Sequence, residues 1–223
     1  MVDADIAPVA ALLGDPARAA IVTALNDGRA LPAGELARRA GIAPSTASEH
    51  LARLVDGGLL AVEPSGRHRY FRIASPEVAH AVESLAVLAP SRPARSLRDA
   101  AIGDALAAAR TCYDHLAGAL GVALTDALLR ERAIVERDGA FALGPQAATV
   151  LEPLGLEPAA LPGRRPATRR CLDWSERRPH LAGALGAALC ERALDRRWVE
   201  RLPGSRAVRL TPAGRRAFAP LGV

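Results

Sequence analysis

The sequence predicts a mainly α-helical protein of two domains, the second of which mixes helices with short strands. Its 223 residues are enough for one or two domains. Half of the residues are hydrophobic but only 3% are aromatic, so the core must consist of Ala, Leu and Val, which favours helices packed on helices. A segment repeated in the second half indicates an internal duplication. We expect a domain at 1–88, a linker at 89–98 and a second domain at 97–223.

Charge, cysteine content and hydropathy limit the partners and the cellular location that we expect for the protein. The formal charge is +5, but residues 1–88 carry 8 Arg against 10 Asp and Glu, so net charge does not mark this half as a nucleic-acid binder. Three cysteines without an export signal argue against a disulfide framework. No apolar run approaches the roughly 18–20 residues of a membrane span. We expect a cytoplasmic protein with no membrane partner.

The first domain begins with three predicted helices. Asp15 is a favoured N-cap and Pro16 a favoured first residue, so a helix is expected from this point. Further helices are predicted at 33–40 and 44–56, separated by a tight break at Gly41.

A hairpin and a fourth helix complete the first domain. Strands are expected at 59–63 and 67–73, joined by the turn residues 64–66, because apolar and polar side chains alternate after the turn. A helix at 76–88 follows. This order of elements is that of a winged helix-turn-helix.

Three segments carry a family resemblance. LLGDPARAAIVTAL (12–25), GELARRAGIAPSTASEHLARLVDGGLL (34–60) and VEPSGRHRYFRI (62–73) resemble the ArsR/SmtB family of bacterial transcriptional repressors, over residues 10–88. The resemblance implies a homodimer that binds double-stranded operator DNA. It also implies that the second helix of the turn motif enters the major groove, while the wing contacts an adjacent minor groove or phosphates.

The polar face of helix 44–56 and the wing supply the candidate DNA contacts. Hydroxyls near a helix N-terminus suit phosphate or base-edge contacts, and guanidinium groups at a hairpin tip are long enough to enter a groove. Glu49 either accepts a hydrogen bond from cytosine N4 or repels phosphate. The same residues also fit an ordinary solvated surface. The candidates are Ser45, Thr46, Ser48, Glu49, His50, Arg53, Arg67, His68 and Arg69.

The second domain contains the duplication. HLAGALG occurs at 115–121 and again at 180–186, and the similarity extends over 115–155 and 180–222. Each copy is predicted to be a helix, a two-stranded hairpin and a helix, which is half of a winged-helix unit. We expect this domain to sense an effector or to support the dimer.

A Cys-x-Asp sequence precedes each repeated helix, with a histidine nearby. If the copies pack about a pseudo-twofold axis, these side chains converge and suit a divalent metal ion of the Zn, Cd or Pb type. Alternatively, the two thiols form a redox-switched disulfide, or the aspartates are helix N-caps and the Cys and His residues belong to the core. The candidates are Cys112, Asp114, His115, Cys171, Asp173 and His180.

The metal sites best known in the resembled family are not expected here. GELARRA (34–40) has no Cys pair, and PEVAHAVESL offers only His80 and Glu83. Cys190 is expected in the core. Helix 76–88 has apolar residues at near-heptad spacing and is expected to form much of the dimer contact.

These observations predict a dimeric DNA-binding repressor that a metal ion, a thiol-reactive agent or a small molecule releases from its operator. The alternative is that the second domain serves only for dimerisation or protein interaction. No catalytic residues are expected, because no phosphate-binding loop, HExxH motif or nucleophile elbow is present in the sequence.

Overall fold

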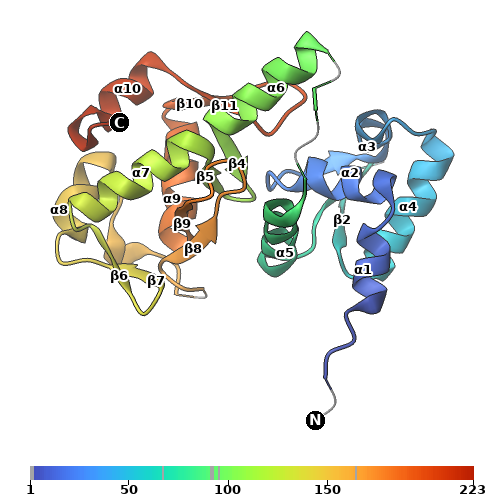
Figure 1. The fold of residues 1–223 in the computed structure, drawn as a ribbon, viewed down its shortest axis with the longest axis horizontal. Helices are drawn as coiled ribbons and strands as arrows, with labels where there is room; N and C mark the ends of the chain where they lie inside the picture. Colours follow the sequence, from blue (N-terminus) through green and yellow to red (C-terminus); the bar gives the residue numbers. More distant parts are fainter. Residues whose placement is uncertain (1–2, 67, 91–92, 95, 164) are drawn as a thin grey trace. The chain divides into compact units, whose positions relative to one another are not determined.

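The computed structural model describes residues 3–66, 68–90, 93–94, 96–163 and 165–223 (Figure 1). The candidate Arg67 lies outside the described residues, as does the side chain of His68. The chain divides into two compact units, Met1–Val82 and Glu83–Val223. Among the described residues no single helix is long and apolar enough to span a membrane. The first two helices pass that test only as a pair bent by 88°.

The first unit has the predicted order of helices and hairpin, with two additions. Asp15 caps the second helix as predicted, because its side chain accepts a hydrogen bond from the Arg18 amide. The additions are a short first helix and a two-residue strand. Both elements are too short to give a periodic pattern in the sequence. The elements are α1 (Ala7–Leu13), α2 (Pro16–Leu25), β1 (Leu31–Pro32), α3 (Ala33–Ala40), α4 (Pro44–Asp56), β2 (Leu60–Ser65) and β3 (His68–Ile73), followed by α5 (Pro76–Leu88), which begins in the first unit and ends in the second.

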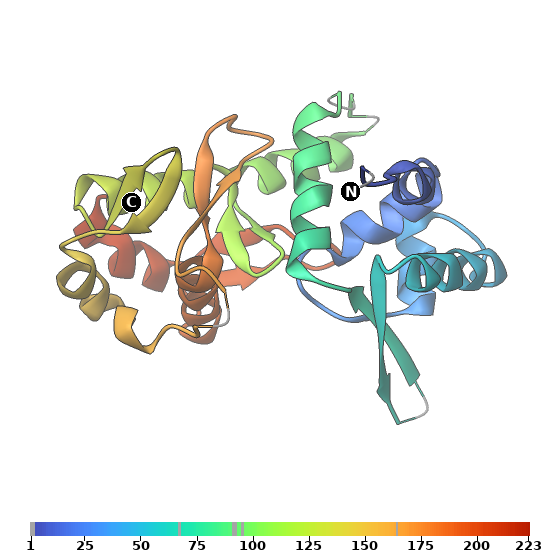
Figure 2. The ribbon, with the colours of Figure 1, turned by 90° about the horizontal axis from the view of Figure 1, so that it is seen from below.

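A three-stranded antiparallel sheet in the order β1-β3-β2 supports the wing. Leu31 pairs with Phe71, and Leu60 pairs with Ile73, so the base of the hairpin is buried. Leu51 and Leu54 bury the inner face of α4 against the same core. The outer part of the β2–β3 hairpin extends beyond the helices of its unit (Figure 2). The fold therefore leaves one face of α4 and the wing tip exposed.

The second unit contains two stretches with the same order of elements, preceded by α6 (Leu97–Ala108). Each stretch consists of a hairpin, a helix, a second hairpin, a short helix and a 3-10 turn. The first is β4 (Arg110–Cys112), β5 (His115–Ala117), α7 (Gly118–Arg130), β6 (Ile134–Arg137), β7 (Ala140–Leu143), α8 (Ala147–Leu151) and η1 (Glu152–Leu154). The second is β8 (Arg169–Leu172), β9 (Pro179–Ala182), α9 (Gly183–Asp195), β10 (Val199–Arg201), β11 (Val208–Leu210), α10 (Pro212–Phe218) and η3 (Ala219–Leu221). A further turn, η2 (Pro158–Ala160), lies between them.

The leading hairpin of each stretch was not predicted. Helix α6 ends at Ala108, and Arg110 begins strand β4. The strands have only three or four residues, so alternation gives no usable signal. His115 and His180 consequently lie on strands β5 and β9, just before helices α7 and α9.

The helix of each stretch packs against the leading hairpin of the other stretch. Helix α9 packs against β5 of the first stretch, and α7 packs against β9 of the second. Gly186 lies under the β-carbon of His115, and Gly121 lies under that of His180. A β-carbon at either glycine would be 2.5 Å from a backbone oxygen of its own stretch, so the repeated Gly permits this close packing.

Candidate functional site

The polar face of α4 is exposed along the first turns of the helix. Ser45, Thr46, Ser48, Glu49 and Arg53 are all exposed, whereas Ala47, Leu51 and Leu54 face the core. Pro44 begins the helix, so its first amide groups have no intrahelical acceptors and remain available to an anion. The arrangement gives one helix face rich in short hydroxyls beside a guanidinium group.

His50 differs from the other candidates on α4 because it faces α2. Its Nδ1 is 3.5 Å from a guanidinium nitrogen of Arg18, and its Nε2 is 4.0 Å from Asp15 Oδ1. Its side chain is only 15% exposed. His50 is therefore positioned to fix α4 against the start of α2.

The described part of the wing carries one exposed candidate, Arg69. Its guanidinium lies over the Phe71 ring, 5.7 Å from the ring centre. Arg69 and Ser48 line the same groove between α4 and the wing. Arg72, in contrast, is occupied by an ion pair with Glu63 on the neighbouring strand.

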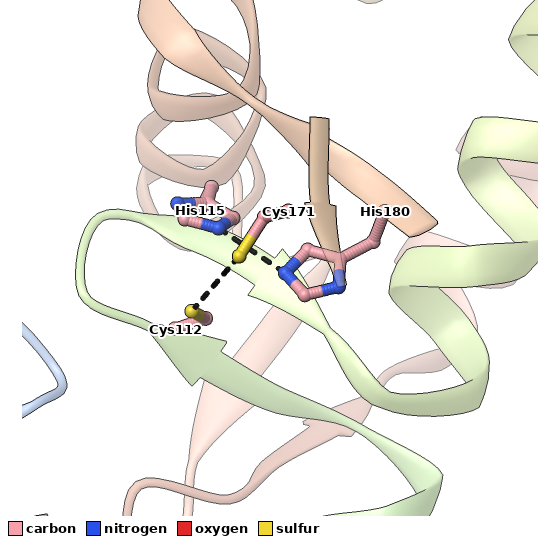
Figure 3. Close-up of side chains that lie close together, drawn as sticks. All are labelled: Cys112, His115, Cys171 and His180. Carbon is pink, nitrogen blue, oxygen red and sulfur yellow. Dashed lines mark hydrogen bonds between the residues drawn. The ribbon is translucent and has the colours of Figure 1, made fainter. Parts of the chain in front are cut away.

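The second unit brings a cysteine and a histidine from each stretch into one cluster (Figure 3). In the first hairpin Cys112 pairs directly with His115, and in the second Cys171 pairs directly with His180. Directly opposed residues place their side chains on the same face of a hairpin. Each hairpin therefore presents one thiol and one imidazole to the other.

The four side chains are buried, and their polar atoms are close together. The two Sγ atoms are 4.0 Å apart, and the two Nε2 atoms are 3.2 Å apart. One ligand atom from each residue lies within 4.8 Å of every other. The most exposed of the four, His115, is 7% accessible. We call Cys112, His115, Cys171 and His180 the Cys/His cluster.

The two aspartates stand behind the histidines and are not the N-cap residues of the helices that follow them. The residues that precede α7 and α9 are Ala117 and Ala182, neither of which caps with a side chain. Asp114 Oδ1 is 3.1 Å from His115 Nδ1. Asp173 Oδ2 is 3.2 Å from His180 Nδ1 and also accepts a hydrogen bond from the Gly118 amide at 2.7 Å.

Each aspartate is paired with an arginine that the sequence patterns did not reveal. Arg110 lies 3.0 Å from Asp173, and both side chains are fully buried. Arg165 lies 2.5 Å from Asp114, at about 30% exposure of each side chain. The Trp174 ring stacks on the Arg110 guanidinium at 4.4 Å. Each arginine lies more than 50 residues from its aspartate partner in sequence, so no local motif marks the pair.

Electrostatics favour positive charge inside the cluster. Burial opposes a charged His115, but hydrogen bonds to Asp114 and Cys171 outweigh it and raise the pKa of His115 to about 9. The pKa of the Cys112 thiol lies well above its usual value, because the Cys171 sulfur and burial both disfavour a second negative charge. The pKa of Asp173 is held below its usual range, because its contacts with His180 and Arg110 exceed the cost of burial.

A chain of contacts within the second unit connects the cluster to α5. Thr111, next to Cys112, donates from its amide and its hydroxyl to the Arg206 carbonyl, at 3.0 and 3.3 Å. The Arg206 side chain forms an ion pair with Glu83 of α5, and the Glu83 side chain is only 1% exposed. Helix α5 is continuous from Pro76, so it joins the two units covalently.

A helix-turn-helix with an exposed polar second helix and a hairpin wing defines the winged-helix class of DNA-binding proteins. The helix-turn-helix domain family matches residues 13–63. The uncharacterized HTH-type transcriptional regulator YdfF of Bacillus subtilis (strain 168) is 44% identical over 215 residues, covering 96% of this chain and 95% of the relative. The chain belongs to this family of HTH-type transcriptional regulators.

Two of the solved structures that are similar to this chain each cover a little more than a third of it. HlyU from Vibrio cholerae N16961 is 28% identical, with a TM-score of 0.35. The match covers 37% of this chain and 88% of the HlyU chain. The homodimeric winged helix-turn-helix domain of Mb0332 from Mycobacterium bovis, a possible ArsR-family regulator, is 30% identical. The match covers 37% of this chain and 76% of the Mb0332 chain, with a TM-score of 0.35.

Proposed function

We propose that this regulator is a homodimeric repressor that reads operator DNA through α4 and the wing, and that an effector bound by its second unit releases it. The observation that carries the proposal is the exposed hydroxyl and guanidinium face of α4, set on a helix-turn-helix whose other face is buried. Ser45, Thr46, Ser48, Glu49 and Arg53 would face the major groove, and Arg69 would contact the backbone beside it.

The dimer is supported by the apolar surface of α5. Leu85 is 49% exposed and Leu88 is 81% exposed, although both are large apolar side chains on a regular helix. A second copy would bury these residues and place two reading helices one helical turn of DNA apart. Leu88→Glu is expected to shift the protein toward the monomer in sedimentation equilibrium. A monomeric wild type that still binds DNA tightly would rule out the dimer.

DNA reading is tested by fluorescence anisotropy with a duplex from the region upstream of the protein's own gene and with a scrambled duplex. Arg53→Ala is expected to cost about 1–3 kcal/mol of specific binding, roughly a 5- to 150-fold loss of affinity. Arg216→Ala is the matched control, since it removes the same charge from an exposed position on α10 of the second unit. Equal affinities for the two variants would contradict reading by α4.

The alternative role of the second unit, as a dimerisation or protein-interaction module without an effector, predicts a different result. In that case no metal ion, oxidant or chelator changes the DNA affinity of the full chain. We favour the effector role, because a module used only for assembly has no need of a buried cluster of two thiols and two imidazoles.

A further inference from the structure

We propose that the Cys/His cluster is a closed, four-coordinate site for a zinc-class divalent cation, with Cys112 and Cys171 as thiolate ligands and His115 and His180 bound through Nε2. This inference rests on the proposed function in one respect, since it names the effector of the second unit. The existence of the site is independent of what the site does to DNA binding.

The spacing of the ligand atoms fits a tetrahedral ion. An ion with bonds of about 2.3 Å to sulfur and about 2.0 Å to nitrogen spaces two sulfurs by about 3.8 Å and two nitrogens by about 3.3 Å. The corresponding distances in the cluster are 4.0 Å and 3.2 Å. With each remaining pair within 4.8 Å, small side-chain rotations complete the coordination.

The orientation of the histidines demands a positive charge between them. Each Nδ1 lies beside a carboxylate, 3.1 Å from Asp114 for His115 and 3.2 Å from Asp173 for His180, which favours the tautomer that carries its proton on Nδ1. Both Nε2 atoms then present lone pairs to one another at 3.2 Å, which is repulsive unless a proton or a metal ion lies between them. Carboxylates behind the ligating imidazoles are a common second layer of zinc sites.

The surrounding charges balance a bound dication. Two thiolates neutralise the ion, and each aspartate is already neutralised by its own arginine, Arg110 or Arg165. Binding requires each thiol to lose its proton to solvent, and a proton held by the histidines leaves with them, so affinity falls as pH falls. Four protein ligands leave no open position for substrate, which is typical of structural and sensing sites rather than catalytic ones.

The ligands come equally from the two stretches, so the ion would join them. One Cys and one His come from the β4–β5 hairpin, and the other pair comes from the β8–β9 hairpin (Figure 3). The cysteines lie in a small core cluster with Ala117 and Ala182, one alanine from each hairpin. Metal loading is therefore expected to stabilise the contact between the stretches.

The test titrates Zn²⁺ and Co²⁺ into the full-length protein after removal of metal with a chelator under reducing conditions. We expect one ion per chain, thiolate-to-Co²⁺ charge transfer in the near ultraviolet, and the intense visible bands of tetrahedral Co²⁺. Cys112→Ala and His180→Gln are each expected to weaken Zn²⁺ binding by about 100-fold or more. Cys190→Ala is the matched control, because this third buried cysteine lies in the α9 core and is not part of the cluster.

Several results would overturn the site. These are less than one ion per chain, an octahedral Co²⁺ spectrum, or equal affinity in the Cys112→Ala and Cys190→Ala variants. A Cys112–Cys171 disulfide that forms in place of metal binding would also overturn it. If a variant fails to fold, the stoichiometry and Co²⁺ spectrum of the wild type decide alone. Unchanged DNA affinity in a metal-loaded protein would leave the site standing and refute only its role as the effector site.

Discussion

Asp173 and Asp114 stand behind the two histidines, and we predict that neutralising them has very different effects on stability. Asp173 is fully buried with Arg110, and it also accepts hydrogen bonds from Gly118 and Ser175. Asp173→Asn leaves the buried guanidinium without a counter-charge. Removing one partner of a buried ion pair costs about 3–5 kcal/mol. Asp114→Asn breaks the partly exposed pair with Arg165 instead, which is worth about 0–1 kcal/mol, and it keeps a side-chain oxygen that can accept from His115 Nδ1.

The assay is equilibrium urea unfolding in the presence of a chelator, followed by tryptophan fluorescence. Trp174 and Trp198 are the two tryptophans of the chain, and both belong to the second unit, so the signal reports that unit. With a urea dependence of about 2 kcal/mol/M, Asp173→Asn is expected to lower the midpoint by about 2 M. Asp114→Asn is expected to lower it by less than about 0.5 M.

Equal midpoint shifts for the two variants would refute the assignment of Asp173 as the buried counter-charge. No shift for Asp173→Asn would refute it as well. A variant that is unfolded without urea agrees with the prediction only if Asp114→Asn remains folded in the same buffer.

Three further predictions concern the wing, the contact between the stretches and the link to α5. Arg69→Ala is expected to reduce the slope of log affinity against log salt by about one, as measured by anisotropy, because one phosphate contact is lost. An unchanged slope would remove Arg69 from the interface. Gly186→Ala is expected to lower both the urea midpoint and the Zn²⁺ affinity, because its methyl group would lie 2.5 Å from the Leu181 carbonyl oxygen. Wild-type values for both would contradict the packing argument. Glu83→Gln removes the charge that pairs with Arg206 and is expected to reduce the effect of Zn²⁺ on DNA affinity while Zn²⁺ affinity itself changes little. A full metal effect in this variant would place the coupling elsewhere.

The elements of the first unit were predictable because each has a local chemical signal. Asp15 and Pro16 mark a helix start, and Gly41, with φ of +68°, marks the end of α3. The two-residue strand β1 has no such signal, since it exists only through pairing with Phe71 and its neighbour on β3. Non-local pairing of this kind cannot be read from a short stretch of sequence.

The residues of the Cys/His cluster were predictable, but the manner of their approach was not. The duplication identified both cysteines and both histidines as candidates. The hairpin registers that set Cys112 opposite His115, and Cys171 opposite His180, depend on loops of different length. The burial of Arg110 could not be predicted from the sequence, because it depends on an ion pair with Asp173, which is distant in the chain.

The most direct test of the whole account is the DNA affinity of the metal-free and Zn²⁺-loaded protein, measured side by side for the wild type and Cys171→Ala. The account predicts that Zn²⁺ weakens operator binding by the wild type by about tenfold or more, a coupling of about 1.4 kcal/mol, and leaves the variant unchanged. Equal operator affinity of the wild type in its two metal states, with the ion shown to be bound, would contradict it.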